Sequence, residues 1–536
     1  MLQNNRKYRF LISFFVVFLF FSAAACRESV RSGSDNQFRV NLGTEPPSLD
    51  WSLATDHVSF NVIANLMVGL TEFDKSLKPA PVIAKSWDIV EGGRKIVFHL
   101  RDDVRWSDGQ QVRAQDFEYS WKRLLNPQTA SEYAYILFDV VNAQEYHEGK
   151  LTDPATVGVK ALDDTTLAVE LRHPASYFLA ITTFEVTFPQ RRDLIEKFST
   201  RWTEPGHIIT NGPFLLASWK HENEIVLRAN PHFFRGKPAM ETVTMFMVNE
   251  KTTAFAMYEQ GQLDFIDNKS IPIFEKGKLA NKRGFKRVPQ LRGYYYGFVT
   301  DKKPFHDPRV RRAFMMAIDR SAFPTILHGG EIPAPSWIPP GMPGHNLKIG
   351  LPFNPVEARR LLREAGYPGG KGFPRVLLAY NTEEDHKMVA EAIQGMWQRN
   401  LGIVATLENQ EWKVYLKKLQ NDPPHIFRLG WGADYPDPDN FMKLFTANSG
   451  NNNTRWKHAR YDQLLEQAAR ELNPKKRNKL YDEAQRILCE NELPIMPLFW
   501  TAESTVLSPR FTGLEINSMA RMDLRHVRPA AKADGN

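Results

Sequence analysis

The sequence predicts an α/β protein that is divided into two or three domains. With 536 residues, the chain is too long to form a single hydrophobic core. Its composition of 42% hydrophobic and 24% charged residues is that of a folded protein. Segments with strand-like alternation and segments with helical periodicity follow one another without a strict order, which favours α/β lobes over a closed barrel.

Several segments alternate apolar and polar side chains as half-buried strands do. In residues 95–100, Ile96, Phe98 and Leu100 share one face. This period of two is typical of a strand that packs one face on a core. By similar patterns we expect strands at residues 37–42, 167–171, 225–227, 285–291 and 426–429.

Helical periodicity marks two further segments. Residues 114–125 carry their large apolar side chains on one stripe, as an amphipathic helix does. Asn354 and Pro355, followed by Glu357, form a typical helix start. We expect that helix to end at Gly366, because glycine is common just past the last helical turn.

The first 25 residues have the pattern of an export signal. Basic residues precede an apolar run at 11–21, which is shorter than the ~20 residues that span a bilayer. Ala23, Ala25 and Cys26 follow, and this placement of cysteine resembles the lipobox of bacterial lipoproteins, where the thiol carries a diacylglycerol. An ordinary signal peptidase site explains the same residues. Both interpretations predict cleavage before Cys26 and export, with residues 26–36 as a tether that is lipidated at Cys26 in the first case.

Charge and cysteine content exclude several classes of protein. The net charge is +8, of which three positive charges lie in the leader, and the remaining basic residues are scattered. Nucleic-acid binding is therefore not supported. The sequence has no second apolar stretch that is long enough to predict a membrane span. Cys489 is the only cysteine besides Cys26, so we expect a buried structural thiol and no internal disulfide.

Signals for catalysis or for a cofactor are poor. Residues 366–372 are rich in glycine but lack the spacing of a phosphate-binding loop. Asp434, Asp437 and Asp439 are separated by prolines, and no glutamate follows at the spacing that a calcium loop requires. We therefore expect no metal, no cofactor and no enzymatic activity.

Acidic and aromatic residues cluster after the predicted strand at 426–429. Asp434 lies just past this strand, between Trp431 and Tyr435. An aspartate in such a place is most often a turn or cap residue. The functional alternative is a buried carboxylate held for a cation, with aromatic walls that exclude water.

Eight short segments occur in the order known from one family of transport proteins. They are residues 43–50 (GTEPPSLD), 84–87 (AKSW), 106–109 (WSDG), 116–121 (DFEYSW), 210–214 (TNGPF), 307–311 (DPRVR), 409–412 (NQEW) and 430–435 (GWGADY). On these segments the chain resembles the solute-binding proteins of peptide-type ABC importers, the family 5 extracellular solute-binding proteins, and within them the oligopeptide-binding type.

The resemblance implies a two-lobed periplasmic binding protein of type II (cluster C-like) with an extra third domain. Two crossing strands would join the lobes. By position, the first lobe would comprise residues 37–68, 193–291 and 502–536, the extra domain 69–192 and the second lobe 292–501.

The resemblance also implies a mechanism and a set of ligand-binding residues. The ligand would lie extended between the lobes, with its main chain paired as in strand addition. Asp434 would pair with the α-ammonium of a short peptide, and Tyr133 would help to hold that end. The other residues implied to line the cleft are Trp431, Trp412, Tyr295 and Arg428, with His386 and His328 at the carboxylate end.

The chain departs from the family pattern at several cleft positions. The two cysteines of the family disulfide are Arg292 and Gly432 here, and a cleft glutamate is Gly297. Leu419 replaces a cleft arginine, and His328 replaces a lysine. We therefore expect a conserved ammonium end and a changed preference for peptide length or C-terminus, including cell-wall peptides. An alternative is that His328 is only a surface loop residue.

Three functions are compared on this basis. The first is a peptide receptor, expected to be a monomer, that is anchored through Cys26 and delivers its ligand to the transmembrane subunits of an ABC permease. The second is a binder of the same fold for a chelate, haem, a sugar or an opine, against which the ammonium-pairing Asp434 argues. The third is an exported peptidase, for which the sequence offers no nucleophile or metal site.

Overall fold

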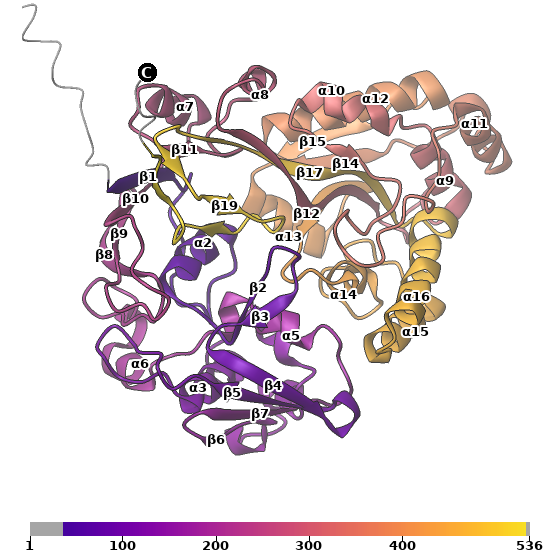
Figure 1. Cartoon of the computed structure of the whole chain (residues 1–536). Helices are drawn as coiled ribbons and strands as arrows, with labels where there is room; N and C mark the ends of the chain where they lie inside the picture. Colours follow the sequence, from indigo (N-terminus) through magenta and orange to yellow (C-terminus); the bar gives the residue numbers. More distant parts are fainter. Residues whose placement is uncertain (1–35, 532–536) are drawn as a thin grey trace, which may run out of the picture.

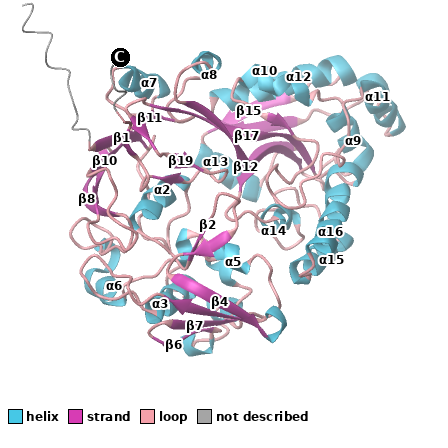
Figure 2. Ribbon diagram, in the orientation of Figure 1, coloured by secondary structure: helices cyan, strands magenta, loops and turns pink. Residues whose placement is uncertain are grey.

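The structure is a computed structural model that describes residues 36–531. The predicted signal segment, Cys26 and most of the tether lie outside the described residues. Three main sheets surround a central region of loops that includes the short strands β2 (Thr71–Phe73) and β3 (Pro79–Pro81) (Figure 1). The secondary structure mixes helices and strands throughout, which agrees with the predicted α/β class (Figure 2).

The first sheet joins the N-terminal strand to strands that lie some 200 residues later. Its order is β1-β10-β9-β8, and β1 runs parallel to β10 with Gln37 beside Thr242. The strands are β1 (Gln37–Asn41), β8 (Phe214–Lys220), β9 (Glu224–Ala229) and β10 (Thr242–Phe246). Helix α2 (His57–Leu66) contacts β8 from the side of the central region.

A second sheet is formed within residues 84–170. Its antiparallel strands follow the order β4-β5-β7-β6, and they are β4 (Ala84–Val90), β5 (Lys95–Leu100), β6 (Val159–Asp163) and β7 (Thr166–Glu170). The amphipathic helix α3 (Ala114–Leu125) packs on β6 and β7 and buries Trp121 completely. The core of this part is continuous with that of the first sheet.

The third sheet contains strands from the middle and the end of the chain. Its order is β11-β17-β12-β16-β14-β15. The strands are β11 (Phe265–Ile266), β12 (Phe285–Phe298), β14 (Leu377–Asn381), β15 (Thr406–Gln410), β16 (Ile426–Gly432) and β17 (Ile495–Leu507). Helices α9 (Pro308–Met316), α11 (Pro355–Glu364) and α12 (Glu384–Leu401) belong to the hydrophobic core on one of its faces.

Two long neighbouring strands, β12 and β17, run from the first sheet region into the second lobe (Figure 1). Their antiparallel register shifts between Pro289 and Gly293. On one side of the shift β17 also pairs with β11, and on the other side β12 also pairs with β16. The shift falls near residues 291 and 292, where the resemblance implies a boundary between the first and the second lobe. The domain boundaries themselves stay a prediction.

The remaining helices are short or pack at the periphery. They are α4 (Ala143–His147), α5 (Phe178–Ile181), α6 (Arg192–Phe198), α7 (Lys251–Glu259), α8 (Ile273–Leu279), α10 (Phe323–Leu327), α13 (Trp412–Asn421), α14 (Pro438–Met442), α15 (Ala459–Arg470) and α16 (Pro474–Arg486). Within residues 36–531, no helix is both long and apolar enough to cross a membrane.

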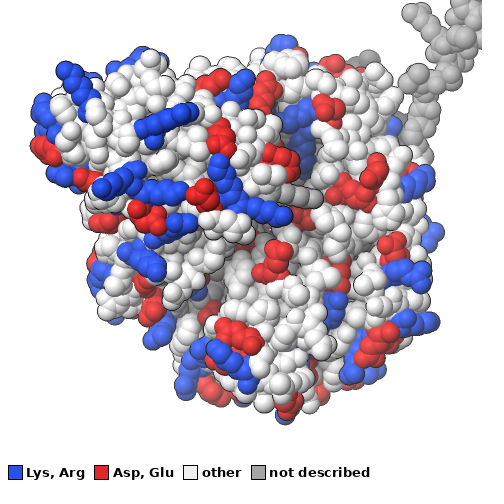
Figure 3. Space-filling view, turned by 180° about the vertical axis from the view of Figure 1, so that it is seen from behind, with Lys and Arg blue, Asp and Glu red and all other residues white. Residues whose placement is uncertain are grey.

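Local sequence signals agree with the observed elements. The predicted helix at residue 354 is α11, where the Asn354 side chain accepts a hydrogen bond from the Glu357 backbone N–H at 3.1 Å. Gly366 follows it with a φ of +94°, a value that glycine adopts without strain. Cys489 is buried, as predicted. Basic and acidic side chains are interspersed on the face seen in Figure 3, which agrees with the scattered charge of the sequence.

Candidate functional site

The candidate site follows a free edge of strand β16. Strand β12 pairs with β16 from Ile426 to Gly432, but β14 pairs only with Ile426 and Phe427. The Tyr415 hydroxyl donates to the Arg428 carbonyl at 2.7 Å and accepts from the Arg428 backbone N–H at 2.9 Å. The backbone N–H and C=O of Arg428 therefore point away from β12.

Main-chain groups alternate sides along a strand, so those of Gly430 and Gly432 face the same edge as those of Arg428. Among the described strands, none pairs with this part of β16 on that side. An open strand edge is a template for another extended chain. The edge from Gly430 to Gly432 is therefore suited to bind an extended ligand by its main chain.

Asp434 lies at the end of this edge and is held by two hydrogen bonds to its carboxylate. Tyr133 donates its hydroxyl to one oxygen at 3.1 Å, and Asn440 donates its amide to the other at 3.0 Å. Asn440 also accepts the backbone N–H of Asp434 and the indole N–H of Trp431, at 3.1 and 2.9 Å. Asp434 and Tyr133, both predicted from sequence, are thus in contact, and Trp431 is tied to them through Asn440.

Burial raises the pKa of the Asp434 carboxyl, while Asn440, Tyr133 and the more distant Arg521 act in the opposite direction. Arg521 is itself paired with the buried Glu185 at 2.9 Å. A buried carboxylate is costly unless it meets a cation or several donors. The site therefore favours a ligand that brings a positive charge and hydrogen-bond donors, such as an ammonium group.

The short helix α14, which carries Asn440, is fixed by a buried ion pair. Asp437 caps helix α14 by accepting the Asp439 backbone N–H at 2.9 Å. Arg477 of α16 donates to both oxygens of Asp437, each at 2.7 Å, and both residues are buried. This ion pair therefore supports the position of Asn440, and through it that of Asp434.

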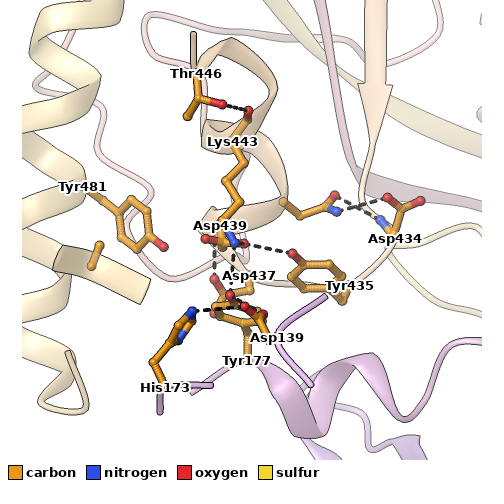
Figure 4. A network of polar contacts seen from close by, with 12 residues as sticks. Asp139, His173, Tyr177, Asp434, Tyr435, Asp437, Asp439, Lys443, Thr446 and Tyr481 are labelled. Atoms are coloured by element: carbon orange, nitrogen blue, oxygen red, sulfur yellow. Dashed lines mark hydrogen bonds and ion pairs between the residues drawn. The ribbon is translucent and has the colours of Figure 1, made fainter. Parts of the chain in front are cut away.

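A polar network next to Asp434 joins the second lobe to residues 139–177 (Figure 4). Lys443 contacts Asp439 at 2.9 Å and donates to the Tyr177 hydroxyl at 3.0 Å. Tyr177 in turn donates to Asp139 at 2.7 Å, and its ring stacks on Tyr435 at 5.7 Å. Together with the Tyr133–Asp434 bond, this network connects the predicted extra domain with the second lobe at the end of the cleft where Asp434 lies.

Arg428 lies at the other end of the free edge. Its guanidinium donates to Asn381 at 3.1 Å and lies 4.4 Å from the centre of the Tyr294 ring. The Tyr294 hydroxyl is 3.3 Å from Nδ1 of His386. Burial, followed by the charges of Arg428 and Lys251, lowers the pKa of His386 to about 2. His386 is therefore a neutral imidazole here, and the positive charges near it are those of Arg428 and Lys251.

The site residues line three cavities of about 400, 720 and 400 Å³. Asp434 lines the first, Trp431 the second, and Arg428 with His386 the third. The two ends of the free edge therefore both open into space that a ligand can occupy.

Three further residues implied by the resemblance line none of these three cavities. Tyr295 is buried in the core against Trp337 and Phe445, because neighbouring residues of β12 point to opposite faces and Tyr294 takes the cleft face. Trp412 is 44% exposed on α13. His328 is an exposed cap of α10 whose carbonyl accepts a hydrogen bond from Arg287, as the surface-residue alternative expects.

Several residues of the site were missed by sequence reasoning. They are Asn440, Tyr294, Arg521 and Glu185. The alternation of β12 is a signal that could have indicated Tyr294, since it shares a face with the strand's polar residues. Nothing local to Asn440, Arg521 or Glu185 points to Asp434, because their contacts depend on chain folding.

Tyr133→Phe tests the hydrogen bond to Asp434. Because a hydrogen bond to a charged group contributes roughly 1.5–3 kcal/mol, we expect affinity for tetra-alanine to fall about tenfold or more. Titration calorimetry measures the change. Tyr135→Phe is the matched control, since its ring stacks on Tyr133 at 5.8 Å and its hydroxyl makes no hydrogen bond within the described residues. Equal losses in both variants would contradict the assignment.

Comparisons with known proteins place the chain in a family. A sequence profile described as bacterial extracellular solute-binding proteins, family 5 Middle, matches residues 78–453. The oligopeptide-binding protein OppA of Bacillus subtilis is 34% identical over 497 residues, which is 89% of each chain.

Solved structures agree with this placement. The murein tripeptide-binding protein MppA of Escherichia coli has a TM-score of 0.80 and 32% identity, covering 92% of this chain and 98% of that chain. A complex of Haemophilus influenzae OppA with RPPGFSPFR has a TM-score of 0.79 and 29% identity, covering 93% and 100%. The predicted two-lobed fold is thereby confirmed, and the chain belongs to family 5 of the bacterial extracellular solute-binding proteins.

Proposed function

We propose that this protein is an exported, non-catalytic peptide receptor of an ABC import system, which binds short peptides in extended form between its lobes. One observation carries the proposal: a partly buried carboxylate, Asp434, lies just past the end of an unpaired strand edge and is held by residues of two different parts of the chain. The carboxylate suits the α-ammonium of a peptide, and the edge suits its main chain.

The names of the relatives support a peptide ligand, since OppA is an oligopeptide-binding protein and one of the solved structures holds a nonapeptide. Within residues 36–531, no group of three His, Cys, Asp or Glu side chains is arranged to hold a metal ion. Cleavage before Cys26, with lipidation of that thiol and attachment to a membrane, is part of the proposal, as are the domain boundaries and a monomeric state.

Mass spectrometry of what co-purifies with residues 27–536 is the direct test. We expect a mixture of short peptides, released intact by denaturation. A single non-peptide species would overturn the proposal in favour of a binder for another solute. Peptides that are cleaved during incubation with the protein would instead indicate a peptidase.

Ligand-linked stabilisation gives an independent measurement. A ligand at a concentration of 100 times its Kd adds about 2.7 kcal/mol to the stability of the form that binds it. Tri-, tetra- and penta-alanine are therefore expected to raise the unfolding temperature by a few degrees. N-acetylated forms of the same peptides, which lack the ammonium group, are expected to have little effect. Equal shifts for both series would contradict a role of the ammonium group.

A further inference from the structure

Arg292 of β12 and Gly432 of β16 lie directly opposite each other on these two paired strands. The Ala433 N–H donates to the Leu291 carbonyl, so Arg292 and Gly432 form a pair without direct main-chain hydrogen bonds. In such pairs the side-chain positions are close together and on one face. Since glycine has no side chain, the guanidinium covers it: Arg292 Nε lies 3.1 Å from where a Cβ of Gly432 would be.

The guanidinium has no partner within the described residues, where it forms neither a hydrogen bond nor an ion pair. Its side chain is accessible to solvent and lines the same 400 Å³ cavity as Arg428. Desolvation in these surroundings lowers the pKa of Arg292. A cation that is open to this cavity and has no partner in the protein is available to pair with an anion.

The neighbouring acidic groups form no ion pair with Arg292 within the described residues. Glu503 is the acidic group that acts most on Arg292, but burial and then the charge of Asp267 raise the pKa of Glu503 to about 7. Its carboxylate is occupied by the backbone N–H of Asn268 at 2.8 Å. Lys269, on the same side of the cavity, is paired with Asp267 at 2.7 Å.

A second unpaired polar group lies at the same point. His57 of α2, from the first lobe, places its Nε2 3.5 Å from the Cβ position of Gly432. Its Nδ1 is buried without a hydrogen-bond partner. Arg292 from a crossing strand and His57 from the first lobe therefore meet over Gly432 of the second lobe.

The distance to the ammonium site sets which part of a ligand reaches Arg292. Strand β16 ends at Gly432 and Asp434 follows two residues later in a bend, so their main chains are at most about 7 Å apart, at ~3.3 Å per residue. Counted from the ammonium nitrogen, the first two residues of an extended peptide together span that length. A peptide with its ammonium group on Asp434 therefore has its second residue near Arg292.

We propose that Arg292 binds a carboxylate carried at the second residue of the ligand, so that this receptor prefers peptides that are acidic at that position. The carboxylate is either the side chain of Asp or Glu or the C-terminus of a dipeptide. This inference rests on the proposed peptide-binding function and adds a specificity-determining residue to it. The guanidinium would donate two parallel hydrogen bonds to the two carboxylate oxygens, as arginine–carboxylate pairs do.

Calorimetric titration with matched peptides tests the inference. The wild-type protein is expected to bind Ala-Glu-Ala-Ala roughly ten- to a hundredfold more tightly than Ala-Gln-Ala-Ala. In Arg292→Gln this preference is expected to fall below about threefold. The second comparison is between Ala-Ala and its C-terminal amide. If the wild type prefers the free acid and Arg292→Gln removes this preference, Arg292 binds the C-terminal carboxylate of a dipeptide.

Two further variants make the test specific. Lys251→Gln removes another cation of the same cavity, which has no ion pair within the described residues, and is expected to keep the preference. Arg292→Lys keeps the positive charge and is expected to retain part of the preference, and it serves as the test variant if Arg292→Gln does not fold.

The outcomes separate this inference from the proposed function. If Ala-Gln-Ala-Ala and Ala-Ala amide bind but the wild type shows no preference for either acid, only the role of Arg292 fails. The role of Arg292 also fails if Arg292→Gln keeps the wild-type preference for the acidic peptides. It fails as well if Lys251→Gln loses that preference to the same extent as Arg292→Gln. If none of the four peptides binds, the proposed function itself fails.

Discussion

Replacing Asp434 with Asn is expected to lower the affinity for tetra-alanine by a factor between about 30 and several thousand. Breaking a charge pair on one side in a desolvated site costs about 2–5 kcal/mol. Asn keeps the size of the side chain, so the loss reports the charge rather than a cavity. Tyr133 and Asn440 both hold this carboxylate in the structure, at 3.1 and 3.0 Å. Titration calorimetry on the purified protein measures the change.

Acetylation of the peptide provides the control for Asp434. N-acetyl-tetra-alanine lacks the ammonium group, so it should bind the wild type weakly and Asp434→Asn about as weakly. The two changes together then form a double-mutant cycle, whose coupling energy isolates the charge pair. A coupling energy near zero would show that Asp434 does not pair with the ammonium group, even if each change alone weakened binding.

Arg477→Ala is expected to destabilise the second lobe by about 3–5 kcal/mol, because it leaves the carboxylate of Asp437 buried without its cation. Arg477 donates to both oxygens of Asp437 at 2.7 Å, and both residues are buried. The midpoint of urea unfolding, followed by tryptophan fluorescence, measures the effect. Because Asp437 caps the helix that carries Asn440, the affinity for tetra-alanine is expected to fall as well.

The matched control for Arg477 is Arg460→Ala on the adjacent helix α15. Arg460 pairs with Glu483 at 2.8 Å, but both side chains are nearly half exposed, at 46% and 49%. Exposed ion pairs contribute about 0–1 kcal/mol, so its midpoint should change little. If both variants shift the midpoint by the same amount, the buried pair has no special role in holding helix α14.

Much of the local structure could be predicted because its signals are short in range. The alternation of residues 95–100 predicted the strand that is observed as β5, since one face of a half-buried strand repeats every second residue. The cap at Asn354 predicted the start of α11 for a similar reason. Both signals lie within a few residues of the element that they specify.

The cleft was predictable only in part. The resemblance implied Asp434, Tyr133 and Arg428 as ligand-binding residues, and the structure places them at the two ends of one strand edge. It also implied Tyr295, although Tyr294 faces the cavity. Two neighbouring tyrosines in a strand look alike in sequence, and only the packing of both sheet faces decides which one points into the cleft.

The sequence by itself determined the α/β class, the family and the aspartate at the end of a strand. The tertiary structure alone decided what surrounds that aspartate and the edge leading to it. Tyr133 reaches Asp434 across 301 residues of sequence, and Arg292 covers Gly432 because two distant strands pair in one register. Contacts of this kind depend on strand register and on the packing of one lobe against another, and no local sequence pattern encodes either of them.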